Sequence, residues 1–163
     1  MTPWTLPSPQ NDFLAPHVAH LLRSYRQLLG RDMVDPALSP IEQAQILFEA
    51  PFAVVSHHAA NAGEEPIFNY GNRTALELFA MTWEEFTCLP SRLSAEPVHQ
   101  AERARLFERV RTQGYIDDYR GVRIASTGRR FWIENATVWT LYDEAGQLYG
   151  QAALFDNWKD IEL

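Results

Sequence analysis

The chain has 163 residues, 46% of them hydrophobic, which predicts a single domain over residues 16–163 after a proline-rich arm over residues 1–15. Its formal net charge is -7 at pH 7, and acidic and basic residues are interspersed, which disfavours a nucleic acid as a direct partner. The single cysteine and the lack of a long apolar run favour a cytoplasmic protein with no disulfide, no secretion signal and no membrane span.

Two helices and two short strands are predicted in the first part of the domain. Apolar residues recur at helical spacing from Pro16, a residue that favours helix starts, to Gly30, which favours helix ends. A second helix follows Ser39, whose side chain can cap it, and Glu42 is placed to complete a capping box. The strands are expected over residues 52–57 and 67–70.

Three further helices are predicted before the long strands. The first follows a turn at residues 69–72 and has Ala75, Leu78 and Phe79 on one side. Thr82, with Glu85 three residues later, forms another capping-box pattern and predicts a short helix that Pro90 ends. Apolar residues among charges over residues 98–113 predict a longer amphipathic helix that Gly114 ends. Its charges are expected to form a solvated face with local ion pairs: Glu102, Arg103, Arg105, Glu108, Arg109 and Arg111.

Three strands joined by short turns are predicted next, over residues 115–126, 129–142 and 147–155. If residues 127–128 form a two-residue turn, Ser126 pairs with Arg129 and the register of the first hairpin is fixed. Placing Tyr142 opposite Gln147 fixes the second hairpin. The sequence therefore predicts an α+β fold, with an antiparallel five-stranded sheet, short helices on one face and N-terminal helices.

This register divides the strand side chains between two faces. The more apolar face is expected to look into the core, around a polar centre formed by Asp118, Arg120, Asn135 and Thr137. The other face is expected to lie under the first helix or a second subunit, and carries Tyr115, Tyr119, Arg123, Trp132, Glu134, Val138, Tyr149 and Phe155. A one-residue error in register would send the polar centre to the surface.

The polar centre is the predicted ligand site. A buried charge needs a partner, so Arg120 is expected to bind Asp118, a ligand, or both. Small residues beside it leave room for a small molecule, and residues at a strand-to-helix junction are further candidates. The candidate ligand-binding residues are Phe68, Tyr70, Asn72, Asp118, Arg120, Ile133, Asn135, Thr137, Trp139, Gly150 and Ala152. The alternative is an internal ion pair in a filled core.

Catalytic and metal sites have weaker support in the sequence. Ser56, His57 and His58 could form a hydrolytic triad with Asp118, but no strand-turn-helix nucleophile elbow surrounds any serine. The histidines, His99 included, form no paired metal-ligand motif, so no metal site is predicted. A small hydrolase or isomerase that uses Asp118 and a histidine stays as an alternative.

Several blocks of sequence, taken in order, resemble the MEKHLA domain family. They cover residues 43–52, 68–79, 83–86, 89–97 and 128–133. That family is related to Per-ARNT-Sim (PAS) domains, and occurs as stand-alone bacterial proteins and at the C-terminus of plant homeodomain leucine-zipper factors. The resemblance implies a sensory or regulatory role, with no established catalytic activity or cofactor. Cys88 lacks the surrounding sequence typical of flavin-adduct photoreceptors.

We therefore expect a PAS-like sensory module that binds a small organic ligand or a protein partner in a cavity over the sheet. It would signal through its N-terminal helix, or as a homodimer formed by that helix or by the outer sheet face. A third alternative is a pure protein interaction domain whose core is filled. The sequence identifies neither the ligand nor a cofactor.

Overall fold

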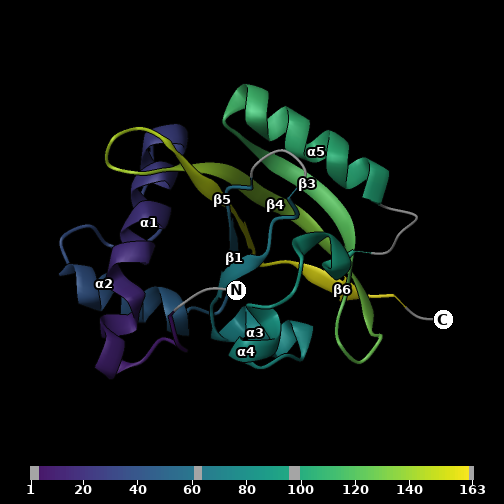
Figure 1. The fold of residues 1–163 in the computed structure, drawn as a ribbon, viewed down its shortest axis with the longest axis horizontal. Coiled ribbons are helices and arrows are strands. Elements are labelled where there is room, and N and C mark those ends of the chain that lie inside the picture. Colours follow the sequence, from purple (N-terminus) through teal and green to yellow (C-terminus); the bar gives the residue numbers. More distant parts are fainter. Residues whose placement is uncertain (1–3, 61–63, 96–99, 162–163) are drawn as a thin grey trace.

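A six-stranded antiparallel sheet forms the centre of the computed structural model, which describes residues 4–60, 64–95 and 100–161 (Figure 1). Its strands are β1 (Ala53–His58), β2 (Phe68–Gly71), β3 (Tyr115–Ile124), β4 (Arg130–Tyr142), β5 (Leu148–Phe155) and β6 (Trp158–Asp160). The order across the sheet is β2-β1-β5-β4-β3, and β6 pairs with β4. The sequence predicted the first five strands and missed β6, a three-residue strand that pairs with β4 past the end of β5.

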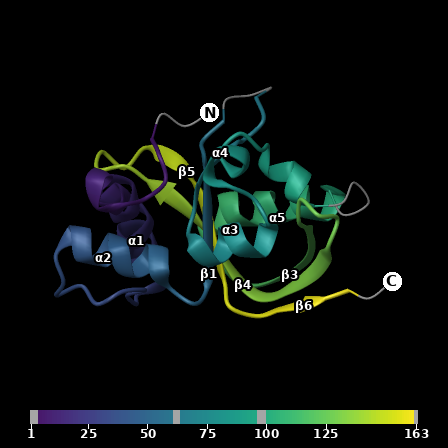
Figure 2. The same cartoon turned by 90° about the horizontal axis from the view of Figure 1, so that it is seen from below.

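The N-terminal helices cover one face of the sheet, as Figure 2 shows. They are η1 (Pro9–Leu14), α1 (Ala15–Leu29) and α2 (Pro40–Glu49). Helix α1 packs against α2 and β4. The indole of Trp139 on β4 donates from Nε1 to the Leu21 carbonyl at 3.3 Å and meets the Tyr25 ring edge-on. A fully buried tryptophan therefore fixes the position of α1 on the sheet.

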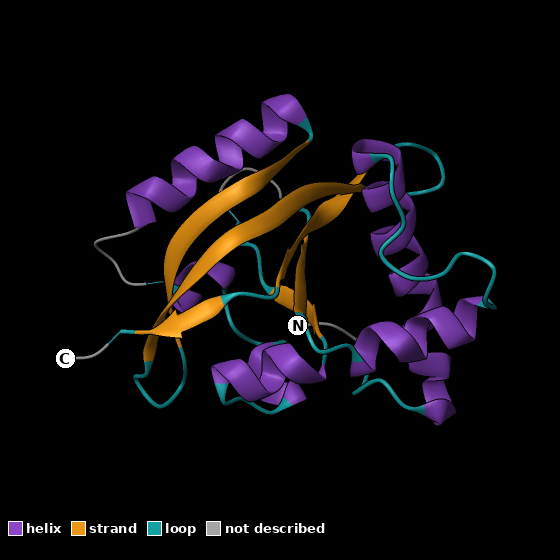
Figure 3. Cartoon of the chain, turned by 180° about the vertical axis from the view of Figure 1, so that it is seen from behind, coloured by secondary structure: helices purple, strands orange, loops and turns teal. Residues whose placement is uncertain are grey.

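The later helices cover the opposite face (Figures 2 and 3). They are α3 (Arg73–Phe79), α4 (Trp83–Phe86), η2 (Ser91–Ser94) and α5 (Gln100–Gln113). Helix α5 lies along β3 and β4, where Leu106 and Val110 pack on Ile116 and Val138. Residues 98–99, where the sequence predicted the start of this helix, lie outside the described residues. Among the described helices, none combines the length and apolar character needed to cross a membrane.

The helix ends follow the local signals in the sequence. Gly30 ends α1 with a φ of +74°. The Ser39 and Glu42 pair forms both hydrogen bonds of a capping box at α2, and Thr82 with Glu85 does the same at α4. These predictions are confirmed, because each rests on residues within one turn of each other.

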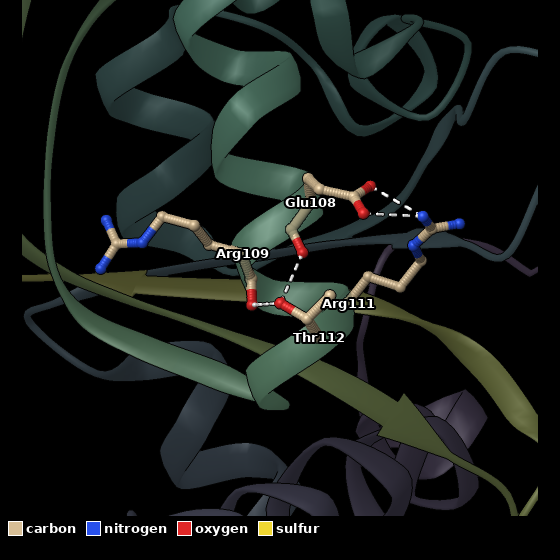
Figure 4. A network of polar contacts seen from close by, with 4 residues as sticks. All are labelled: Glu108, Arg109, Arg111 and Thr112. Carbon is tan, nitrogen blue, oxygen red and sulfur yellow. Dashed lines mark hydrogen bonds and ion pairs between the residues drawn. The ribbon is translucent and has the colours of Figure 1, made fainter.

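The outer side of α5 carries the predicted local ion pairs (Figure 4). Arg111 donates to both carboxylate oxygens of Glu108 at 2.8 Å. The Thr112 hydroxyl donates back to the Glu108 and Arg109 carbonyls of its own helix. The Arg109 guanidinium lies 3.6 Å from the Asp118 carboxylate on β3. All of these charged groups are largely exposed, so each pair contributes little to stability.

The β3–β4 hairpin differs from the predicted register by one residue. The Ala125 amide donates to the Arg129 carbonyl at 2.8 Å, which leaves a three-residue loop between them. Gly128 in this loop has a φ of +86°, the left-handed conformation that such loops require at that position. As a result Arg123 lies opposite Phe131, and side chains near the hairpin change face relative to the prediction.

Bulges change the pairing again farther along the strands. Asn135 has a φ of +52° beside a register shift between β3 and β4. In the second hairpin, Tyr142 pairs with Leu148 and Leu141 pairs with Gly150, so the predicted pairing of Tyr142 with Gln147 is wrong. The face of each side chain therefore depends on loops and bulges that alternation alone does not reveal.

Candidate ligand-binding site

A small cavity lies on the sheet face that α3, η2 and α5 cover. Its wall is mainly apolar and includes Phe68, Phe79, Ile133, Val138 and Phe155. Polar residues join the wall from three strands and from η2: Ser56, His57, Ser91, Ser94, Tyr119, Arg123 and Gln151. An apolar space with a few polar groups is the usual composition of a small-molecule site.

The cavity volume is about 50 Å³. Since one water needs roughly 10–15 Å³ measured in this way, the space accepts about three or four water-sized groups. Most of the room between sheet and helices is therefore filled by side chains. The sequence left an open pocket and a filled core as alternatives, and the volume of this cavity is intermediate between them.

A tyrosine and an arginine on β3 form one edge of the cavity. A Cβ atom on Gly121 would meet the Tyr119 hydroxyl at 2.2 Å, so the tyrosine ring lies back across this glycine. The Arg123 guanidinium then lies 5.3 Å from the centre of the Tyr119 ring. Among the described residues, the guanidinium donates one hydrogen bond, to the Val122 carbonyl at 3.1 Å. Gly121 thus allows an aromatic ring and a cation to stack along the edge strand.

Three of the predicted ligand-binding residues line this cavity. Phe68 and Ile133 contribute side chains from β2 and β4, and Ala152 lies in the wall on β5. The Phe68 ring also stacks on Phe86 of α4, with the ring centres 4.3 Å apart. These three residues are buried, and of the candidates at the strand-to-helix junction Phe68 is the one that lines the cavity.

The predicted polar centre does not exist. Asp118 and Arg120 have side chains 67% and 56% exposed, and Asn135 is exposed as well. Arg120 pairs with Glu134 at 3.3 Å and lies 3.8 Å over the Trp132 ring. The prediction is wrong because the three-residue hairpin loop and the bulge at Asn135 turn these side chains outward. Asp118 lies 3.6 Å from the Arg109 guanidinium of α5.

Three other predicted residues lie on the opposite face of the sheet, with the N-terminal helices. Trp139 packs against α1, and Thr137 is two residues away on the same face. Gly150 pairs with Leu141, and a Cβ atom on it would meet the His57 carbonyl oxygen at 2.2 Å. Gly150 therefore allows close approach of β1 and β5, and does not widen a cavity.

The two polar candidates at the strand-to-helix junction have structural surroundings. The Asn72 amide nitrogen donates to Leu47 and Phe52 carbonyls, and its oxygen accepts from the Val54 and Ala75 amides. All its hydrogen-bonding capacity serves to join β1, α2 and α3.

Tyr70 points toward the N-terminal side of the sheet. Its ring contacts the rings of His17 and Trp83. Its hydroxyl is buried and has no hydrogen-bond partner among the described residues. Burial raises the pKa of Tyr70, which keeps the phenol neutral. This residue belongs to a cluster that sequence reasoning did not identify.

The centre of that cluster is His17 on α1, a buried side chain. Its Nδ1 lies 2.9 Å from the Tyr149 hydroxyl, and its Nε2 lies 3.0 Å from the Ser56 hydroxyl. The Ser56 hydroxyl donates to the side-chain oxygen of Asn69 at 2.6 Å. We call these residues, with Tyr70, the His17 cluster. It joins α1 to strands β1, β2 and β5.

The hydrogen bonds fix the positions of the protons in the cluster. Since Ser56 donates its proton to Asn69, its oxygen must accept from Nε2 of His17. Nδ1 of His17 is then unprotonated and accepts from Tyr149. A serine nucleophile needs the opposite arrangement, with the imidazole accepting the serine proton, so this pair is not placed for catalysis.

Burial, with a smaller effect from His20, lowers the pKa of His17 to about 3. The ring is therefore neutral near pH 7. No group of three or more metal-ligating side chains occurs among the described residues, so the cluster offers no metal site.

Two β-bulges direct side chains into the His17 cluster. Asn69 is the extra residue between the pairs Ser56–Tyr70 and His57–Phe68. Tyr149 is likewise the extra residue in β5, opposite the step from Leu141 to Tyr142. Bulges of this kind redirect a side chain. The two neighbours of β1, strands β2 and β5, thus each have a bulge beside the His17 cluster.

A segment before α1, residues 4–14, covers the cluster, and we call it the N-terminal strap. Trp4 donates from Nε1 to the Asn69 carbonyl at 2.7 Å, and its ring lies 5.0 Å from His17. Trp83 of α4 donates to the Trp4 carbonyl at 3.2 Å. Asp12, Phe13 and Leu14 all have positive φ, which costs about 1–2 kcal/mol for each residue. The buried side chains of Phe13 and Leu14 offset this strain.

Solved structures of low sequence identity share this fold. The PAS domain of a protein from Colwellia psychrerythraea has a TM-score of 0.60 at 18% identity, over 74% of this chain and 94% of that chain. A light-oxygen-voltage domain studied with a flavin analogue has a TM-score of 0.57 at 13% identity, over 74% and 85%. A serine-for-cysteine mutant of Vivid has a TM-score of 0.56 at 12% identity, over 83% and 97%.

The sequence comparisons give a family and no characterised relative. None of the curated proteins matches the chain at a significant level. The family model described as the MEKHLA domain matches residues 15–160, from the first residue of α1 to the last of β6. The order of the strands, the helices on both faces and this match agree, and the chain belongs to the MEKHLA domain family with a PAS-like α+β fold.

Proposed function

We propose that the chain is a cytoplasmic sensory module that holds a small, mainly apolar organic molecule in the cavity between the sheet and α5. Occupancy changes the contacts of the N-terminal strap and α1, which then act on a protein partner or a second copy of the chain. The observation that carries the proposal is the apolar cavity with a polar edge at the sheet face of a PAS-like fold.

The two faces of the sheet support a route from cavity to strap. On β1, His57 lines the cavity and its neighbour Ser56 belongs to the His17 cluster. On β2, Phe68 lines the cavity and Asn69 belongs to the cluster. On β5, Gln151 lines the cavity and Tyr149 bonds to His17. A displacement of any of these strands by a ligand therefore also moves a hydrogen-bond partner of the cluster.

A flavin, whose analogue was studied in one of the similar structures, does not fit this cavity. Pockets for molecules of that size enclose about 300–1,000 Å³, whereas this cavity encloses about 50 Å³. Cys88 is exposed and does not line the cavity, so it is not placed to form an adduct with a ligand there. The proposal therefore concerns a much smaller molecule.

The test compares ligand retention by the wild-type protein and a variant with a filled cavity. Ala153 on β5 lines the cavity, so Ala153→Leu should occupy the space. Native mass spectrometry of freshly purified protein should show extra mass on the wild type and at least a tenfold smaller bound fraction on the variant. Ala37→Leu, the same change at an exposed loop position, is the control. Equal retention by all three proteins would contradict the proposal.

Self-association is the second part of the proposal, through α1 or through the outer face around Arg120 and Trp132. That outer face is aromatic and charged, and Arg120 is more than half exposed. Sedimentation of the wild type and of Trp132→Ser over a range of concentrations tests the outer face. If the wild type is a monomer at every concentration, self-association is excluded and the partner must be a different protein.

A further inference from the structure

We propose that the molecule in the cavity is a small carboxylic acid, bound as the carboxylate by Arg123 with its hydrocarbon part inside. This inference rests on the proposed function, and it specifies the chemical class of the ligand. The position of Arg123 at the cavity edge and the small volume behind it are the observations that lead to it.

Arg123 combines a place in the cavity wall with the lack of an acidic partner in the described structure. Its side chain is half-buried in the cavity wall, and among the described residues no carboxylate oxygen lies within 4.0 Å of its guanidinium. Arg120, three residues earlier on the same strand, is more exposed and is paired with Glu134. Since a half-buried cation gains most from an anionic partner, Arg123 has a charge that a ligand can satisfy.

The geometry of the guanidinium suits a carboxylate. A guanidinium has five N–H donors, and within the described part of the chain Arg123 uses one of them, for the Val122 carbonyl. The ring of Tyr119, 5.3 Å away, limits the orientations of the guanidinium plane. A planar fork held in this way forms paired hydrogen bonds with a carboxylate better than with a neutral group.

The volume and the wall limit the rest of the ligand. A cavity of about 50 Å³ has room for a body of about three or four non-hydrogen atoms. Its neighbours there would be apolar side chains such as Phe79, Ile133 and Val138. The net charge of -7 opposes anions at long range, so anion binding requires a local cation such as Arg123. Short-chain monocarboxylates meet all these conditions.

The test uses butyrate and its neutral isostere butyramide as probes, titrated into the full chain and followed by amide chemical shifts. The wild type should bind butyrate roughly tenfold or more tightly than butyramide, as expected for charge-assisted bonds. Arg123→Gln should remove that preference and leave butyramide binding within about twofold. Arg123→Lys, which keeps the charge and loses the fork, should give an intermediate preference. Arg111→Gln, at an exposed arginine of α5 that pairs with Glu108, is the control and should behave as the wild type.

The outcomes separate this inference from the proposed function. Equal affinity of the wild type for both probes, or a preference that survives Arg123→Gln, overturns the carboxylate assignment. A third outcome is that neither probe binds, although the wild type retains a molecule that Ala153→Leu loses. This result overturns the carboxylate assignment and leaves the proposed function standing. If Ala153→Leu changes neither retention nor probe binding, the cavity itself is not the site and both proposals fail.

Discussion

His17 is neutral because its surroundings provide no partner for a positive charge. Both ring nitrogens are bonded to hydroxyl groups, and the rings of Trp4, Tyr70 and Tyr149 surround it. The residue is missed from sequence because its partners Ser56 and Tyr149 are 39 and 132 residues away, and no local pattern marks it. The one sequence signal is its place after Pro16, on the first turn of a helix that must pack on the sheet.

Mild acid should destabilise the protein through His17. The pKa of an unfolded histidine is 6.5 and burial lowers that of folded His17 to about 3, so between these values the unfolded state binds more protons. The stabilisation is complete above pH 6.5 and should fall by about 1.4 kcal/mol for each pH unit below it, until about pH 3. Urea midpoints at pH 7 and pH 5 measure this, before most carboxylates are protonated.

His17→Gln is the diagnostic variant for this prediction. It should be less stable than the wild type at pH 7, and it should lose much less stability between pH 7 and pH 5. The pKa of His20 is also lowered, by partial burial first and by Arg23 second, so His20→Gln measures its separate contribution in the same direction. A wild-type stability that does not change between pH 7 and pH 5 would contradict the buried, neutral state of His17.

At the scale of elements, local signals were sufficient for helix ends and insufficient for strand register. The capping boxes at Ser39 and Thr82 were predictable because their bonds join residues three apart. The Ser126-Thr127-Gly128 segment is compatible with a two-residue turn and with a three-residue loop, and only the latter occurs. Because side chains alternate with a period of two, that single residue moved Arg123 from the predicted outer face to the cavity.

Two glycines in the sheet should respond differently to alanine. At Gly150 the added methyl meets the backbone carbonyl of His57 at 2.2 Å, and a strand must move. At Gly121 it meets the Tyr119 hydroxyl, also at 2.2 Å, and a side chain can rotate away. Gly150→Ala should therefore cost about 1–3 kcal/mol of unfolding free energy, and Gly121→Ala clearly less. Urea denaturation of both variants gives the comparison.

The Gly121 variant also has a second readout. Displacement of the Tyr119 ring removes the surface on which Arg123 stacks, so probe binding at the cavity should change although the loss of stability is small. Equal destabilisation by the two substitutions would show that the Tyr119 ring is not free to move. It would also show that Gly121, like Gly150, has a structural role, and does not mainly shape the cavity edge.

For the whole molecule, the order of helices and strands was predictable from the sequence. The sheet face on which each side chain lies was not. The spaced sequence blocks and turn signals gave the α+β class and five strands. Of the predicted ligand residues, Phe68, Ile133 and Ala152 reach the cavity. The candidates on β3, β4 and β5 that do not reach it were misplaced because a hairpin loop and several bulges decide which face each residue takes.

If the sheet couples the cavity to the N-terminal strap, a change at either site must affect the other. Ala153→Leu adds volume beside Gln151 on β5 and should weaken the bond between Tyr149 and His17. Hydrogen exchange of the strap, including the Phe13 amide that bonds to Ser8, should then become faster than in the wild type and in Ala37→Leu.

Coupling between binding sites is reciprocal, so the converse experiment is equally decisive. Trp4→Phe removes the 2.7 Å bond to the Asn69 carbonyl and keeps an aromatic ring against His17, which should loosen the strap without unfolding the sheet. A ligand shifts the equilibrium between closed and open strap only by the ratio of its affinities for the two states. The factor by which butyrate changes strap opening in the wild type should therefore equal the factor by which this variant changes butyrate affinity. Unchanged affinity in a variant whose strap exchanges faster would show that strap and cavity are independent, and that any signal leaves the cavity by another element.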